Sequence, residues 1–174
     1  KKVILSSEIT SIDEYAFMYC TNLTSVTIPS SVTSIGDRAF AGCTSLSSVT
    51  IPNSVTRIGV SAFYECTNLT SVTIPSSVTS IGDSAFAECT SLSSVTIPNG
   101  VTSIGSKAFD NCESLSKVKV LATNATVGTL TFWGLNSNAK IYVLNDTMKT
   151  RVEAAVTDSN ATVEVVTEEQ MKSL

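Results

Sequence analysis

The sequence predicts a solenoid, mainly of parallel β-strands with short helical turns, and two observations carry that prediction. First, the 174-residue chain repeats one pattern with a period of 23 residues, and a fixed period between about 20 and 50 residues is typical of a stack of similar turns. Second, β-branched residues alternate with polar ones inside each copy, which indicates strands rather than long helices. The residues that keep the period are Phe17, Phe40, Phe63, Phe86 and Phe109; Cys20, Cys43, Cys66, Cys89 and Cys112; and Leu23, Leu46, Leu69, Leu92 and Leu115.

The first part of a turn is predicted to be a half-buried strand. In the turn at 69–90, the segment 69–74 alternates between apolar and polar residues, so Val72 and Ile74 should face the core. Pro75 lacks a backbone donor and should end the strand.

The second part of the turn contains two corners and a shorter strand. Residues 78–81 predict that strand, and Gly82 follows it at a corner where we expect a positive φ. Apolar residues three and four apart in 85–89 predict one turn of α- or 3₁₀-helix. A single turn cannot cover its own apolar edge, so successive turns should stack with equivalent strands about 4.8 Å apart.

The order of the turns divides the chain into two regions of one continuous domain. Residues 1–120 should hold a partial first turn, in which Asp13 replaces glycine, and four regular turns. Residues 121–174 should form a C-terminal cap of helix and strand, because a solenoid needs an atypical unit to cover its last core face. The cap is expected to contain, in order, a degenerate turn at 121–143, a helix capped by Asn145 or Asp146 that ends near Ala155, a strand at 161–166 and a frayed helical end at 168–174. Trp133 is interpreted as part of this cap, with ligand binding as the alternative.

The consensus LxxVxIPxxVxxIGxxAFxxCxxL resembles the BspA-type leucine-rich repeat family. The resemblance is close over about 3–120 and loose over 121–143. It implies a right-handed leucine-rich-repeat solenoid with a parallel sheet on its concave face. It also implies an extracellular or cell-surface location and a role in adhesion or host contact, as in bacterial and protist members. It brings no conserved active site.

The phenylalanine and cysteine positions are predicted to form a buried ladder along the stack. Its members are Phe40, Phe63, Phe86, Phe109, Cys43, Cys66, Cys89 and Cys112. Stacked cysteines point their Cβ atoms the same way, which is poor geometry for disulfides. A zinc site would need converging ligands, and the chain has neither histidine nor a CxxC motif. All five cysteines are therefore interpreted as buried thiols.

Composition argues against several classes of function. The net charge is −4 and no basic run occurs, so nucleic-acid binding is not expected. No stretch approaches 18 consecutive apolar residues, so no membrane insertion is expected. Without histidine, and with carboxylates that vary between turns, we expect no enzyme, no metal and no cofactor. A hydrolase that uses a Lys or carboxylate base is the alternative.

Serine and threonine should form two outward rows on the longer strands. The rows contain Ser25, Ser48, Ser71 and Ser94, and Thr27, Thr50, Thr73 and Thr96. Such an array resembles ice-binding β-solenoids, but threonine also suits any exposed strand. Toward the C-terminus the same positions become Lys117 and Lys119, then Lys140 and Tyr142. We predict that these four residues form a patch for an anionic partner, with a solubilising rim as the alternative.

Together these observations predict a protein-binding or adhesion module of a cell-surface or secreted protein. Its partner would be a host, matrix or other surface protein, and the module itself would be a monomer. The alternative is a structural spacer or stalk that presents another domain and has no ligand of its own. The sequence opens inside a repeat, so it is expected to be a fragment of a longer chain, and an absent signal peptide decides nothing about compartment.

Overall fold

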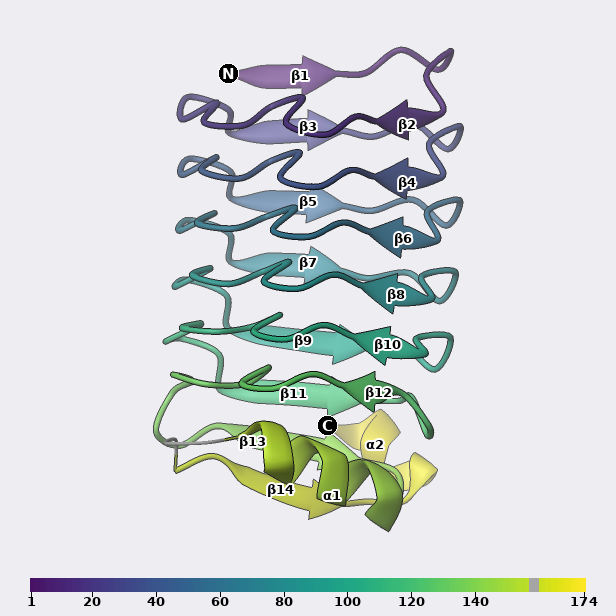
Figure 1. Ribbon diagram of the computed structural model, residues 1–174, viewed down its shortest axis with the longest axis vertical. Coiled ribbons are helices and arrows are strands. Elements are labelled where there is room, and N and C mark those ends of the chain that lie inside the picture. The colour runs from purple at the N-terminus through teal and green to yellow at the C-terminus, as the bar shows by residue number, and fades with distance from the viewer. Residues whose placement is uncertain (157–159) are drawn as a thin grey trace.

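The computed structural model describes residues 1–156 and 160–174 as one stack of similar turns (Figure 1). The N-terminus lies at one end of the stack and two helices lie at the other. The predicted cap also includes residues 157–159, which lie outside the described residues. The parallel β-solenoid that the sequence predicts is confirmed.

The longer strands lie side by side and pair in parallel. They are β1 (Lys2–Ile4), β3 (Ser25–Thr27), β5 (Ser48–Thr50), β7 (Ser71–Thr73), β9 (Ser94–Ile97), β11 (Lys117–Val120), β13 (Lys140–Val143) and β14 (Thr162–Val165). They form two four-stranded sheets, β1-β3-β5-β7 and β9-β11-β13-β14. We call the outward surface of these eight strands the strand face. Val72 is buried while Ser71 and Thr73 are exposed, so the predicted alternation holds.

The second, shorter strand of each turn is also confirmed. These strands form one six-stranded parallel sheet with their neighbours in the stack. They are β2 (Ser11–Ile12), β4 (Ser34–Ile35), β6 (Arg57–Ile58), β8 (Ser80–Ile81), β10 (Ser103–Ile104) and β12 (Thr126–Val127). In each pair the partners are 23 residues apart, as with Ile81 and Ile104.

The predicted helical turn is a run of tight turns instead of a helix. The bonds have the i to i+3 spacing of a 3₁₀-helix, as from the Ala87 N–H to the Ser84 carbonyl at 3.1 Å. Positive φ angles of 53° at Ser84 and 59° at Glu88 interrupt the helical path. They turn alternate N–H groups toward the next turn, so that Phe86 donates to the Ala108 carbonyl at 2.8 Å. This segment is therefore a third ladder between turns.

A glycine is needed at position 82, but the predicted reason, a positive φ angle, was wrong. The positive φ angles of this region belong to Ser84 and its equivalents, not to Gly82. Glycine is needed because the turns approach closely: a Cβ on Gly82 would lie 2.6 Å from the carbonyl carbon of Gly59 and from the nitrogen of Val60. Asp13 stands at the equivalent position in the first described turn, where the described residues include no preceding turn.

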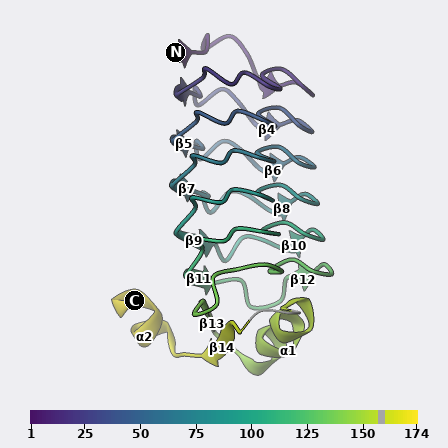
Figure 2. The same ribbon diagram turned by 90° about the vertical axis from the view of Figure 1, so that its left-hand side faces the viewer.

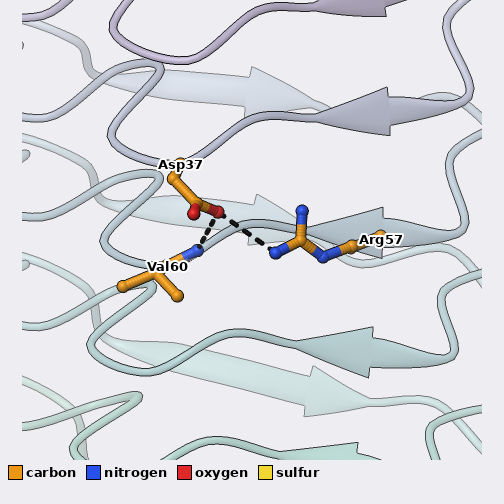
Figure 3. A network of polar contacts seen from close by, with 3 residues as sticks. All are labelled: Asp37, Arg57 and Val60. Atoms are coloured by element: carbon orange, nitrogen blue, oxygen red, sulfur yellow. Dashed lines mark hydrogen bonds and ion pairs between the residues drawn. The ribbon is translucent and has the colours of Figure 1, made fainter.

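An aspartate after some of these glycines links one turn to the next. The Asp37 carboxylate accepts hydrogen bonds from the Val60 N–H at 2.9 Å and from the Arg57 guanidinium at 3.2 Å (Figure 3). Two turns later, Asp83 accepts from the Ser106 N–H at 2.8 Å. In every second turn, an aspartate thus satisfies a backbone donor of the following turn.

The core is a column of stacked phenylalanine rings beside a column of thiols. Six rings from Phe17 to Phe132 stack with centroids 5.2–5.8 Å apart and planes within 6° of parallel. Each buried thiol donates to a phenylalanine carbonyl of the preceding turn, as from Cys66 to Phe40 at 3.2 Å. Cys20 is exposed, contrary to the prediction that all five thiols are buried.

The cap begins with a degenerate turn and continues into helix α1 (Asp146–Ala155). Asn145 is its N-cap, and the Asn145 side chain accepts from the Met148 N–H at 2.8 Å, which confirms the predicted capping. The helix contacts β12, β13 and β14, and buries Met148 and Val152. Helix α2 (Glu168–Ser173) follows β14 and lies on the strand face side of the stack (Figure 2).

Candidate binding surface

The strand face carries two outward rows of side chains that the core does not need. In the regular turns these rows are serine and threonine, and Thr50, Thr73 and Thr96 are exposed on adjacent strands. The hydroxyl groups offer hydrogen bonds without charge. This uniform surface changes character at β11 and β13.

The four predicted site residues lie together on these two strands. Lys117 is paired with Lys140, and Lys119 is paired with Tyr142, in the parallel register of β11 and β13. Since side chains two residues apart share one face of a strand, all four belong to the strand face. The sequence therefore placed these residues next to each other correctly, and whether they bind a partner stays a prediction.

Two of the three ammonium groups are hydrogen bonded to the end of helix α2. Lys117 Nζ donates to the main-chain oxygen of Leu174 at 3.0 Å, and Lys119 Nζ donates to that of Met171 at 3.2 Å. The last carbonyls of a helix have no partner within the helix and carry its partial negative charge. Helix α2 therefore supplies both lysines with acceptors.

The other two site residues also have neighbours that the sequence analysis missed. Lys140 forms an ion pair with Glu164 of β14 at 3.3 Å, with both side chains about half exposed. Tyr142 is only 7% exposed, although Thr96, two strands away in the same row, is exposed. The continuing register, which pairs Tyr142 with Glu164, was a signal that could have identified the ion pair. The 23-residue period does not extend to α2, so it does not indicate where this helix lies.

Two hollows adjoin the end of α2. One, of about 640 Å³, is lined by Thr96, Lys119, Leu121, Glu168 and Met171 among others. The second, of about 430 Å³, is lined by Ser94, Thr96, Lys117, Lys119 and Leu174 among others. Lys119 and Thr96 line both hollows. Helix α2 thus leaves open space on the strand face beside the lysines that it contacts.

A second polar cluster lies on the tight-turn side of the stack. The Tyr64 hydroxyl donates to Glu88 at 3.0 Å, and burial together with this bond raises the pKa of Tyr64. Burial also raises the pKa of Asp110, with Glu88 adding to the effect. Two carboxylates and a phenol provide neither an activated nucleophile nor a set of metal ligands.

The described residues contain neither a metal-binding group nor a membrane-spanning helix. Among residues 1–156 and 160–174, no group of three or more Cys, Asp and Glu side chains is placed to hold a metal ion. Within the same ranges, no helix is long and apolar enough to cross a membrane. The lysines on β11 and β13 and the hollows beside them make this part of the strand face the candidate site.

Solved structures of bacterial leucine-rich repeat proteins are similar to this chain. One from Bacteroides ovatus is 34% identical with a TM-score of 0.74, over 82% of this chain and 39% of that protein. A T. pallidum leucine-rich repeat protein is 28% identical with a TM-score of 0.68, over 95% and 86%. A leucine-rich cell surface protein from Faecalibacterium prausnitzii is 33% identical with a TM-score of 0.54, over 71% and 39%.

The chain therefore spans well under half the length of two of these relatives. No curated protein matches it. The family model described as the BspA type leucine rich repeat region matches residues 2–150 in six copies. That match covers most of the sequence, including all regular turns and the degenerate one. The chain belongs to the BspA-type leucine-rich repeat family.

Proposed function

We propose that this chain is a protein-binding module of a cell-surface or secreted leucine-rich repeat protein, and that it binds through the strand face. The observation that carries the proposal is the change in the outward rows. Serine and threonine at these positions give way to Lys117, Lys119, Lys140 and Tyr142 on two adjacent strands. The regular turns fold with hydroxyl side chains there, so the strand does not require lysine.

The chemistry of this patch favours an anionic partner surface. Lysines in neighbouring strands raise the local positive potential of a chain whose net charge is −4. Complementary charges guide partners into register and speed their association. Tyr142 is only 7% exposed, so the three lysines are the groups of the patch that can meet a partner. The patch therefore suits an acidic region of another protein.

The proposed location and partner follow from the family. The Faecalibacterium prausnitzii relative is a cell surface protein, which supports an extracellular or cell-surface location for this chain. The proposed partner is a host, matrix or other surface protein, bound by a monomer of this module in an adhesive role. A hydrolase is not proposed, since the polar clusters lack an activated nucleophile.

The direct test is binding of the purified chain to a panel of purified matrix and surface proteins by surface plasmon resonance. Lys140→Ser should lower the affinity for a partner several-fold at low salt, because it removes one ammonium group from the patch. Lys2→Ser is the matched control. Lys2 lies in the same outward row at the far end of the face, so its replacement should leave the affinity unchanged. Equal loss in both variants would place the site elsewhere, and no binding by the panel would favour a spacer.

A further inference from the structure

Helix α2 is attached to the strand face by few contacts. Met171 is its buried residue, at 4% exposure, while Glu168, Glu169 and Gln170 are exposed. The described polar contacts from the helix end to the stack are those to Lys117 and Lys119. A six-residue helix with one buried side chain makes few apolar contacts, and such segments open at low free-energy cost.

The helix is nevertheless well formed within itself. Thr167 and Gln170 form a capping box, in which each side chain bonds to the backbone of the other at 3.2 and 2.9 Å. Glu168 and Glu169 in its first turn oppose the helix dipole favourably. A helix of six residues is marginal by itself, so docking on the strand face also helps to keep α2 helical, and undocking would release the whole segment together.

The contacts of α2 also define what the surface beneath it can bind. An ammonium group has three hydrogen-bond donors and no acceptor, so each lysine forms hydrogen bonds to oxygen atoms. In the structure these are the main-chain oxygens of Met171 and Leu174. A carboxylate is a stronger acceptor for the same donors, because it adds the attraction of a full negative charge to the ammonium group.

We propose that α2 is a displaceable strap over a docking site, and that the site takes an acidic peptide segment of a partner protein. Carboxylates of the partner replace the Met171 and Leu174 oxygens on Lys119 and Lys117. The two hollows beside α2, of about 640 and 430 Å³, adjoin both lysines and give a partner room to begin binding. This inference rests on the proposed binding function and adds its partner class and its regulation.

The strap itself can be tested without any partner. In the full chain, Met171→Ser removes the buried anchor, and Gln170→Ala weakens the cap at an exposed position. Lysine acetylation followed by mass spectrometry should then show labelling of Lys117 and Lys119 that is faster by about tenfold with Met171→Ser. Labelling of Lys2, which lies far from α2 on the same face, should not change. Unchanged labelling of Lys117 and Lys119 in both variants overturns the strap.

The docking site is tested with a fluorescent hexaglutamate peptide, amidated at its C-terminus, by anisotropy at low salt. The Met171→Ser chain should bind it about tenfold more tightly than the wild-type chain, because α2 no longer competes. Adding Lys117→Ser and Lys119→Thr, the residues of the regular turns, should abolish that gain. A hexaglutamine peptide should not bind. Equal affinity with and without the two lysines overturns the docking site.

These outcomes separate the inference from the proposed function. If labelling and peptide binding follow the expectation while no matrix or surface protein binds, the strap and the anionic site stand and the proposed natural partner falls. If a protein partner binds but Met171→Ser changes neither labelling nor affinity, the binding function stands and the strap falls. The two proposals therefore fail on different measurements.

Discussion

Six phenylalanine rings from Phe17 to Phe132 give each turn the same central contact. A ring inside the stack has a parallel ring on both sides, at the spacing that aromatic pairs favour. The ring of Phe17 has one such neighbour, Phe40, and is only partly buried. One residue type therefore contributes differently to stability at the middle and at the end of the stack.

Replacing Phe63 with alanine should cost about 3–5 kcal/mol, because it opens a cavity between two stacked rings. Phe17→Ala should cost about half that or less, since its surroundings are already partly open to solvent. Urea unfolding of both variants measures the difference. Equal losses would show that position in the stack does not matter.

Cysteine titration provides a pH-dependent test at the same scale. Burial raises the pKa of Cys43 from 9.0 to about 11 and that of Cys112 to about 12, and it also raises the pKa of Cys66. Above pH 9 the unfolded chain loses these protons while the folded chain keeps them. Their stabilising effect is thus complete below pH 9 and is lost as the pH rises toward 11–12.

Each buried thiol should remove up to about 1.4 kcal/mol of unfolding free energy per pH unit above 9. Urea unfolding at pH 8, 9 and 10 measures this slope. Cys66→Ala should lower the slope by one thiol's share. A slope that Cys66→Ala leaves unchanged would contradict burial of the thiol column.

Single residues also show where the sequence was sufficient. The 23-residue spacing of Phe and Cys predicted which residues lie next to one another, because one repeated register sets the whole stack. The reason for Gly82 could not be predicted, since the sequence shows neither φ nor the 2.6 Å approach of the preceding turn. The exposure of Cys20 depends on its place at the end of the column.

At the scale of elements, helix α1 closes the core at the C-terminal end. Its N-cap has two bonds: Asn145 accepts from the Met148 N–H and donates to the Thr123 carbonyl at 3.0 Å. Arg151 also donates to the Ala125 carbonyl at 2.7 Å. The cap is therefore fixed both by its buried face and by bonds to the last turn.

Asn145→Ala should destabilise the chain by about 1 kcal/mol, since it leaves the Met148 N–H without its acceptor. Asn145→Ser should lose less, because its hydroxyl can still cap the helix. Thermal or urea unfolding compares the two. If serine proved as costly as alanine, the bond to Thr123 and not the cap would be the larger contribution.

Helix α2 shows the limit of prediction at this scale. A frayed helical end was predicted at 168–174, and the structure has a helix at Glu168–Ser173. Its position could not be predicted, because Met171 and Leu174 meet the two lysines across more than 50 residues of sequence. The predicted patch was therefore correct in its strand register and incomplete in its neighbours.

At the scale of the whole molecule, each turn contacts only the turns beside it. A stack of this kind has a stability that is approximately the sum of its turns and of the interfaces between them. One end is covered by α1, while β1 lies at the edge of its sheet at the other end. In the 174-residue chain taken by itself, opening should therefore begin at the first turn.

Hydrogen exchange tests this expectation with two matched amides. The Phe17 N–H bonds to Ala39 and the Phe63 N–H bonds to Ala85, both at 2.8 Å, so the two bonds are alike. The Phe17 amide should exchange at least about tenfold faster, because a terminal turn opens at lower free energy than the whole stack. Similar exchange rates would indicate one cooperative unit without fraying.

The bonds between turns also determine how the molecule would respond to mechanical force. They join residues 22–24 positions apart and thus connect one turn to the next in all three ladders. A pull applied to the two ends would load these bonds one turn after another. Each turn that opened would replace a rise of 5.2 Å with roughly 80 Å of extended chain. A tether built from such turns would lengthen in equal steps and limit the tension on whatever it holds.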